Sequence, residues 1–235
     1  WAVGDAGSLV ASNSIFANYN PGKGSGIFCW GVQQEAGAFP TSLIPTYGAT
    51  ASRSVDIVKV DGTAFDRFYN QKQGTVVADI QMPKGWKDGS GYALVWRTKG
   101  SGSNPRNILY ANGPNAEYLV NLVVDGSAAN QSVLFDTGNK IGSGEISRHA
   151  SGFKTNDFGY SFDGENAMTD TSGTLLDNFT ELNIGSRTGS GAMTGWFRRL
   201  RYFNKKKSSS QLAKLSSTSF LLDKFKGAKA AHSLR

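Results

Sequence analysis

The sequence is poor in cysteine, in charge and in long apolar runs. Cys29 is the single cysteine among 235 residues, so an internal disulfide framework is excluded. No apolar run approaches the ~20 residues that cross a membrane, and we expect no membrane insertion. Charged residues make up only 18% of the chain, which argues against a disordered or coiled-coil protein. No basic-then-apolar leader follows Trp1, so we expect a piece of a longer polypeptide.

Residue patterns that carry catalysis or bind metals are also missing. The two histidines, His149 and His232, have no cysteine or histidine at zinc-ligand spacing. No Gly-x-Ser-x-Gly motif joins a predicted strand to a helix, as serine hydrolases of the α/β class require. Glycoside hydrolases need two carboxylates beside the sugar bond, and the nearest such run, Asp163-Gly-Glu165, falls on a predicted turn. We therefore predict no enzyme activity and no cofactor.

Glycine is abundant instead, with 29 residues scattered without a fixed period between short apolar runs. Asp125-Gly126 and Asp163-Gly164 follow such runs and predict hairpin turns, because glycine supplies the positive φ that a two-residue turn needs. Many short strands separated by such turns indicate an all-β sandwich or barrel. The predicted strands are 27–34, 55–60, 74–82, 91–97, 107–111, 117–124, 132–135, 158–162, 181–184 and 196–203.

The clearest strand is Trp196–Phe203. Regular alternation would divide it into two faces, with positions 196, 198, 200 and 202 on one and 197, 199, 201 and 203 on the other. Its arginines can pack against aromatic rings as cation–π pairs. Two short helices are also predicted, one over 211–215 capped by 208–210, and one over 63–69 with Phe65 and Phe68 facing the core.

Positive charge is concentrated at the C-terminal end. The net charge is +7, and the segment from Trp196 onward carries eleven basic residues against Asp223. Such an end can contact an acidic partner, or it can be a solvated tail that keeps the protein soluble. Arginines mixed with aromatics can also bind nucleic acid by stacking on bases. Alternation on a strand would send half of these residues into the sandwich, so we predict no nucleic-acid partner.

Two parts of the sequence resemble domains of bacteriophage tail proteins. VQQEAGAFPTSLIPT at 32–46 resembles the closing strand and linker of their carbohydrate-binding-module-like domains. The stretches that follow resemble the concanavalin A-like (laminin-G-like) sandwich that is often joined to them. These stretches are RSVDIV at 53–58, FYNQ at 68–71, GTVV at 74–77, SFDG at 161–164, DTSGTL at 170–175, LNIGS at 182–186, MTGWFRRLRYFNKKKS at 193–208 and SQLAKL at 210–215.

The resemblance covers residues 27–216 and implies an antiparallel two-sheet jelly-roll sandwich over 49–216. It places the chain in a tail fibre, tail spike or head decoration protein on the virion exterior, and such proteins are usually homotrimers. Residues 1–48 are then the C-terminal part of a preceding β-rich module with its linker, and 217–235 form a basic tail. Laminin-G-like loops can bind calcium through oxygen ligands, so calcium stays open as a cofactor, although no run of ligands is present.

The function that we expect is host attachment by binding of a bacterial surface polysaccharide, without catalysis and alongside other virion proteins. Glycan binding commonly uses an exposed aromatic ring together with polar groups that fix the orientation of the sugar. Trp86 stands in a loop among lysine, glycine and aspartate, although it could instead plug one end of the sandwich. The candidate ligand-binding residues are Trp86, Asp88, Arg106, Asn107, Tyr110 and Asn112.

Two other functions stay open at this point. One is a structural capsid decoration protein or fibre spacer without its own ligand. The basic end mildly favours this reading, because an anchoring element needs a complementary acidic partner. The other is a polysaccharide-degrading enzyme on the same fold, against which the missing carboxylate pattern speaks.

Overall fold

The computed structural model describes residues 33–34, 43–45, 48–52, 56–83, 92–112, 119–125, 127–135, 144–186 and 191–217. The chain divides into two units, Trp1–Arg53 and Ser54–Arg235, and the helices and strands described here belong to the second. The predicted strand 27–34 lies outside the described residues except for its last two. No helix in the described ranges is long and apolar enough to cross a membrane.

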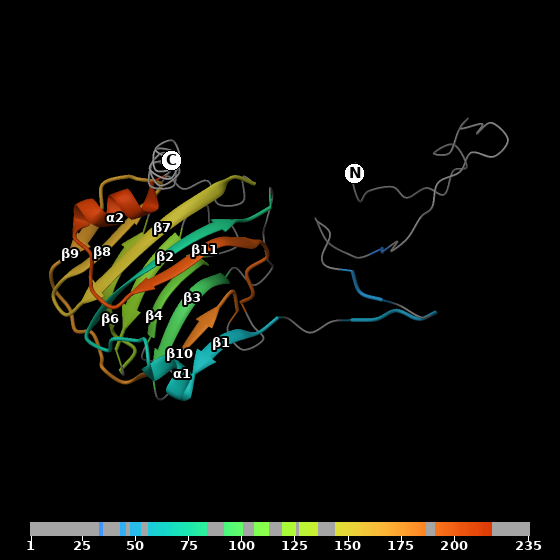
Figure 1. The fold of residues 1–235 in the computed structure, drawn as a ribbon, viewed down its shortest axis with the longest axis horizontal. Coiled ribbons are helices and arrows are strands. Elements are labelled where there is room, and N and C mark those ends of the chain that lie inside the picture. Colours follow the sequence, from blue (N-terminus) through green and yellow to red (C-terminus); the bar gives the residue numbers. More distant parts are fainter. Residues whose placement is uncertain are drawn as a thin grey trace, which may run out of the picture. The chain divides into compact units, whose positions relative to one another are not determined.

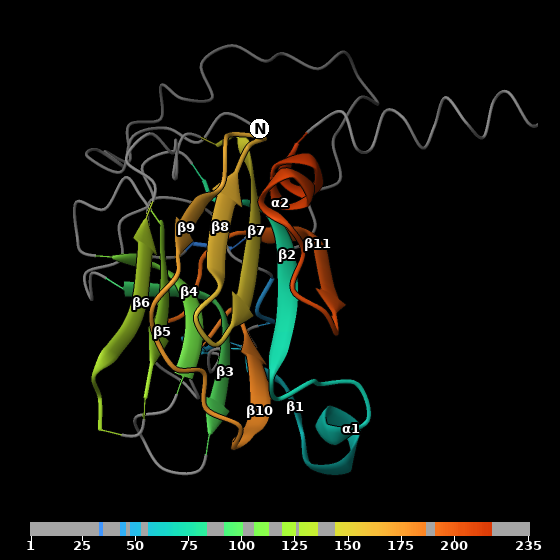
Figure 2. The same cartoon turned by 90° about the vertical axis from the view of Figure 1, so that its left-hand side faces the viewer.

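Two antiparallel sheets lie face to face, which confirms the predicted jelly-roll sandwich (Figures 1 and 2). The six-stranded sheet has the order β1 (Val58–Asp61), β10 (Phe179–Ile184), β3 (Tyr92–Gly100), β4 (Arg106–Asn112), β5 (Leu119–Val124), β6 (Asn130–Phe135). The five-stranded sheet has the order β11 (Trp196–Phe203), β2 (Gln73–Gln81), β7 (Ile146–Lys154), β8 (Phe158–Phe162), β9 (Met168–Asp170). Strands β1 and β11 are therefore edge strands, one in each sheet.

The inner face of each sheet is identified by a shared crevice. Thr98 of the six-stranded sheet lines it together with Val76 and Tyr202 of the five-stranded sheet, so these side chains point toward the opposite sheet. Because side chains alternate along a strand, Trp96 also points inward, and it is fully buried. Tyr160 lies in the same cross-strand row as Val76 and is buried too. Full burial of a large apolar side chain stabilises a fold by about 1.5–3 kcal/mol.

Helix α1 (Gly62–Asp66) closes one end of the sandwich with aromatic rings. Phe65 is fully buried as predicted, but Phe68 is 37% exposed, so its predicted place in the core is wrong. The helix ends at Asp66, and Phe68 therefore leaves the face that Phe65 occupies. Tyr69 takes the inner position instead and stacks on Phe65 with ring centroids 4.4 Å apart.

Helix α2 (Ser209–Ser216) covers the outer face of the five-stranded sheet (Figure 1). Its start is fixed by a capping box, in which the Ser208 hydroxyl accepts from the Gln211 amide and the Gln211 side chain accepts from the Ser208 amide. Leu212 and Leu215 are buried in a cluster with Val77 and Ala150. The helix therefore makes a second apolar core outside the sandwich.

A bulge in β11 overturns the predicted regular alternation. Phe197 pairs with Ile80 of β2, and Arg199 pairs with the next residue, Asp79, so Arg198 is the extra residue. After the bulge, each residue of β11 points to the opposite side of the sheet from the one that regular alternation starting at Phe197 would give. The inward-facing set is consequently Phe197, Leu200 and Tyr202, while Arg199, Arg201 and Phe203 face outward.

One of the two predicted turns is confirmed. Asp163 and Gly164 have φ of 44° and 88°, and the Glu165 amide donates to the Phe162 carbonyl at 2.8 Å. The two-residue turn predicted at Asp125 is wrong. The Asp125 carboxylate accepts hydrogen bonds from the Ser127 and Ala129 amides, and these bonds hold a longer loop that ends where β6 begins.

Candidate functional site

Charged side chains form two adjoining rows on the outer face of the six-stranded sheet. In the first row the register places Asp61, Glu181, Lys99 and Arg106 directly opposite one another across β1, β10, β3 and β4. Such cross-strand neighbours have Cβ atoms about 4.5–5.5 Å apart. Lys99 Nζ lies 3.8 Å from a Glu181 carboxylate oxygen, so the two acceptors of this row meet its two donors at this pair.

The second row consists of Lys59, Asn183 and Arg97. Lys59 pairs with Asp61 of the first row at 2.6 Å, and this hydrogen bond raises the pKa of the Lys59 ammonium. Arg97 and Asn183 are only 5% and 1% exposed. Neither the nitrogen nor the oxygen of the Asn183 amide has a hydrogen-bond partner. We call the two rows together the polar array: Lys59, Asp61, Arg97, Lys99, Arg106, Glu181 and Asn183.

An apolar cluster continues the polar array along the same face. Ile108 lies opposite Arg97 and is fully buried. It belongs to a cluster with Leu94, Val120, Leu122 and Val124, against which Tyr110 packs half-buried. The aliphatic side chains of this cluster are at most 8% exposed, so Tyr110 is the member that partly reaches the surface. An aromatic ring on the same face as charged groups can contribute to holding a ligand with both polar and apolar surfaces.

The structure divides the residues that the sequence predicted as a site. Arg106 belongs to the polar array, and Tyr110 lies on the same face of β4 beside it. The expectation that Asn107 contacts a ligand is corrected, because Asn107 points to the inner face of the sheet and is fully buried. It therefore contributes nothing to the surface. Asn112 ends β4, and its side chain lies outside the described residues. Trp86 and Asp88 also lie outside them.

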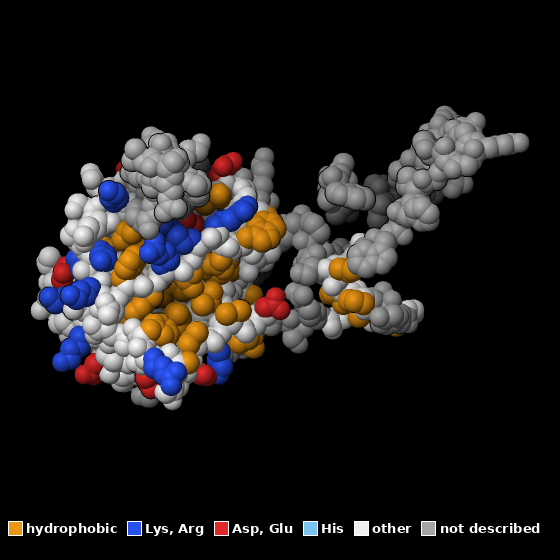
Figure 3. All heavy atoms as spheres, viewed as in Figure 1, with side chains coloured by type: hydrophobic (Ala, Val, Ile, Leu, Met, Phe, Trp, Pro, Cys, Tyr) orange, Lys and Arg blue, Asp and Glu red, His pale blue; other side chains and the backbone are white. Residues whose placement is uncertain are grey.

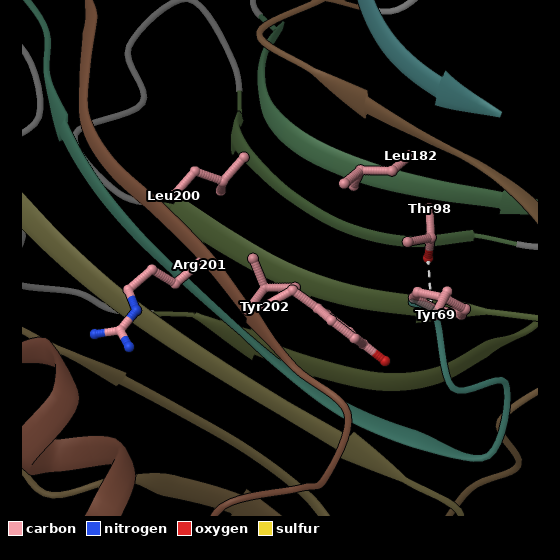
Figure 4. Close-up of a pocket in the computed structure, with 7 residues that line it drawn as sticks. Tyr69, Thr98, Leu182, Leu200, Arg201 and Tyr202 are labelled. Atoms are coloured by element: carbon pink, nitrogen blue, oxygen red, sulfur yellow. Dashed lines mark hydrogen bonds between the residues drawn. The ribbon is translucent and has the colours of Figure 1, made fainter. Parts of the chain in front are cut away.

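A crevice lies between the two sheets (Figure 4). It measures about 140 Å³ and is lined mainly by Leu182, Leu200 and the rings of Tyr69 and Tyr202. The Tyr202 hydroxyl accepts a hydrogen bond from the Asn70 amide at 2.8 Å. Figure 4 shows the Arg201 guanidinium pointing away from the crevice. The hydroxyl groups of Tyr69 and Tyr202, which line the crevice, already make hydrogen bonds, so the crevice suits a polar ligand poorly.

A serine, a histidine and a tyrosine also meet inside the sandwich. His149 Nδ1 is 2.8 Å from the Tyr160 hydroxyl, and the Ser147 hydroxyl contacts the other ring nitrogen. His149 is fully buried, and burial lowers its pKa to about 3. The imidazole is therefore neutral, and solvent does not reach it. This arrangement orders the core and offers no access to a substrate.

The sequence matches no protein-family model and no curated protein. Several solved structures nevertheless share its fold. The CBM40 domain of a Ruminococcus gnavus IT-sialidase, solved with α2,6 sialyllactose, is 13% identical, with a TM-score of 0.51 over 70% of this chain and 97% of that one. The binding domain of botulinum neurotoxin DC, in complex with a ligand named SialylT, is 12% identical, with a TM-score of 0.50 over 68% of this chain and 38% of that one.

A third similar structure is the NanB sialidase of Streptococcus pneumoniae, which is 13% identical with a TM-score of 0.50. It is matched over 70% of this chain and only 27% of that chain. These identities are too low to carry over any residue role, and they establish the jelly-roll sandwich alone. The fold of this chain is thus one that carbohydrate-binding domains also use.

The sequence contains a pattern that could have indicated part of the polar array. Arg97 and Lys99 stand two apart at the end of one strand, and Glu181 and Asn183 stand two apart in another. Polar residues at every second position mark one face of a strand. What the sequence could not supply is that β3 and β10 are neighbours, because that pairing is set by the topology of the sheet.

Proposed function

We propose that this domain is a non-catalytic carbohydrate-binding module that uses the polar array. The observation that carries the proposal is the row of Glu181, Lys99 and Arg106 on three neighbouring strands, whose side chains are all partly exposed. A ligand hydroxyl can accept a hydrogen bond from a cation of this row and donate one to its carboxylate, which favours binding of a polar ligand.

The chemistry of the polar array suits sugar hydroxyls, each of which both donates and accepts hydrogen bonds. Arg97, Lys99 and Arg106 supply donors, and Glu181 and Asp61 supply acceptors within the same two rows. The ring of Tyr110 beside them can cover the apolar face of a pyranose. The fold that the chain shares with sialyllactose-bound domains supports this assignment.

The two carboxylates of the polar array are poorly arranged for glycoside hydrolysis. Asp61 is ion-paired to Lys59, and Glu181 is ion-paired to Lys99. Hydrolysis requires two carboxyl groups that flank one glycosidic bond, and here each carboxylate lies against an ammonium group instead. This pairing supports a binding role without catalysis.

The sequence resemblance to phage tail proteins extends the proposal to a biological setting. In that setting the module sits on the exterior of a virion, within a homotrimeric fibre or spike. It binds a polysaccharide of the bacterial surface and so attaches the phage to its host. The alternative is a decoration or spacer protein without a ligand, in which the polar array would have no partner.

Co-sedimentation with bacterial envelopes tests the proposal. The purified chain is mixed with envelopes from a panel of strains that includes the host, with and without their surface polysaccharide. We expect saturable binding that disappears when the polysaccharide is removed. Lys99→Ala should weaken it by about tenfold, the loss of one charge-assisted hydrogen bond. Lys72→Ala, at an exposed lysine outside the polar array, is the matched control and should bind normally.

Two results would reject the proposal. The first is the absence of binding to any strain, which would favour the structural alternative. The second is equal binding by the Lys99 and Lys72 variants, which would place the glycan site away from the polar array. Release of reducing sugar from the polysaccharide during incubation would contradict the non-catalytic role.

A further inference from the structure

The outer face of the five-stranded sheet carries a dense group of basic residues. Residues 196–217 contain no aspartate or glutamate at all. Figure 3 shows Lys and Arg side chains gathered over the part of the surface that β11 and α2 form. We call the basic residues of this segment the basic strip: Arg198, Arg199, Arg201, Lys205, Lys206, Lys207 and Lys214.

The bulge in β11 explains why so much charge reaches this face. Arg198 occupies the extra position and is exposed, with its guanidinium donating to the Gln81 side chain at 2.6 Å. Beyond it Arg199 and Arg201 both point outward. Without the bulge, Arg198 would share the inner face with Leu200. The fold therefore accumulates cations on one side, although strand alternation would normally divide them.

Two members of the basic strip hold the structure together. Arg199 pairs with Asp79 of β2 at 2.8 Å, and Lys206 pairs with Asp157. Both of these basic side chains are largely buried, at 11% and 9% exposure. The charge available to a partner is consequently that of the exposed members, among them Arg201, Lys205 and Lys214.

The Phe203 ring brings two cations of the basic strip close together. The Arg201 guanidinium carbon lies 5.1 Å from the ring centroid, and Lys207 Nζ lies 4.9 Å from it. The two charges are therefore no more than about 10 Å apart. Cation–π attraction offsets part of their mutual repulsion. The positive potential that remains between them attracts an anion.

We propose that the basic strip binds an acidic polysaccharide through its carboxylate or phosphate groups. This surface lies on the opposite sheet from the polar array, so the inference goes beyond the proposed function and does not depend on it. A nucleic acid binds such surfaces by stacking successive bases on several exposed rings. Tyr202 faces inward and Phe203 is engaged by Arg201 and Lys207, so Trp196, which is 57% exposed, is the exposed ring that the described part of β11 offers. A single exposed ring suits a polysaccharide better than a series of stacked bases.

The test measures binding of the full chain to alginate, an acidic polysaccharide, with dextran as the neutral probe and single-stranded DNA as the competing polyanion. We expect alginate to bind, dextran not to bind, and the affinity to fall steeply as salt rises from about 50 mM to about 200 mM. DNA should bind more weakly than alginate. Lys205→Glu with Lys214→Glu should weaken alginate binding by about tenfold or more.

The matched control is Arg67→Glu, at an exposed position after α1, and it is compared with Lys205→Glu alone so that the net charge changes equally. It should bind alginate within about twofold of the parent chain, because this position lies off the strip and outside the polar array. Lys205→Gln with Lys214→Gln should give an intermediate loss, and it replaces the glutamate variant if that protein fails to fold.

Several outcomes would overturn the inference. Equal losses in the strip and control variants would show a general charge effect. Loss of alginate binding in Lys99→Ala, with the strip variants unaffected, would move the site to the polar array. Tighter binding to DNA than to alginate would identify a nucleic-acid surface. No binding to alginate at low salt would reject the proposal that the basic strip binds an acidic polysaccharide.

Discussion

Arg199 of β11 donates a hydrogen bond to the carboxylate of Asp79 on the neighbouring strand at 2.8 Å. The same Nη2 nitrogen donates to the Leu215 carbonyl near the end of α2, also at 2.8 Å. Asp79 is 3% exposed and Arg199 11%, so the pair is nearly out of water. One arginine therefore joins an edge strand, its neighbour and the helix that covers them.

Removal of one partner from this pair should strongly destabilise the domain. Asp79→Ala leaves the Arg199 guanidinium buried without its anion, and we expect the free energy of unfolding to fall by about 3–5 kcal/mol. Urea unfolding followed by tryptophan fluorescence measures the change. Asp61→Ala breaks the exposed Lys59–Asp61 pair and should have little effect. Similar losses in both variants would show that the burial of the Asp79–Arg199 pair is unimportant.

The contact between Gly159 and α2 gives a second prediction. A Cβ atom at Gly159 would lie 2.8 Å from Leu212 Cδ1, closer than carbon atoms pack. Gly159→Val should therefore push α2 from the sheet and lower stability by about 1–3 kcal/mol. Gly152 lies opposite Gly159 in the sheet, and its nearest neighbour would be 3.4 Å away. Gly152→Ala is consequently the milder control, and an equal loss there would contradict the proposed packing.

The buried histidine predicts how stability changes with pH. Burial lowers the pKa of His149 from 6.5 to about 3, so the folded protein keeps it neutral. The unfolded chain binds that proton below about pH 6.5, and stability should fall from there toward pH 3 by up to about 1.4 kcal/mol per unit. Urea midpoints measured between about pH 7 and about pH 5 test this dependence.

Other titrating groups act mainly below this range. Hydrogen bonds from Ser127 and Ser172 lower the pKa of Asp125 and Asp170, so their stabilising effect is lost only at more acid pH. Burial raises the pKa of Asp163 above its ordinary 3.8. Protonation of this carboxyl group therefore raises the stability of the folded protein as the pH falls, which is opposite to the effect of Asp125 and Asp170. His149→Gln should therefore flatten the profile above about pH 5. A variant that keeps the full slope would exclude His149 as its source.

The strands with apolar alternation were predictable from the sequence, and β7 was not. The inward positions of β7 include Ser147, His149 and Ser151, so its pattern lacks the apolar period that marks a strand. Hydrogen bonds with Tyr160 allow the fold to bury these polar groups. The sequence did not indicate the bulge at Arg198 either, because a bulge depends on how β11 pairs with β2. For the same reason, the sequence indicated Arg106 as a candidate but not the rows that it forms with residues of β1, β3 and β10, because those rows depend on the order of the strands.

Asn183 and Asn107 provide a test that separates a ligand site from an ordinary buried amide. Both residues are almost fully buried and both amides are unpaired, but Asn183 lies on the outer face with the polar array and Asn107 points into the sandwich. Leucine has nearly the same shape without the polar atoms. Each substitution should therefore leave stability unchanged or raise it by about 1–3 kcal/mol, the cost of an unpaired buried group.

The binding arm of this test uses a side chain that reaches the surface. Lys99→Ala should weaken saturable binding of the surface polysaccharide by about tenfold. Asn107→Leu and Asn183→Leu should both retain binding, because both amides are buried. Thermal unfolding and envelope co-sedimentation of the same preparations measure the two effects. Loss of binding in Asn183→Leu without loss of stability would contradict this prediction and show that a ligand reaches the amide.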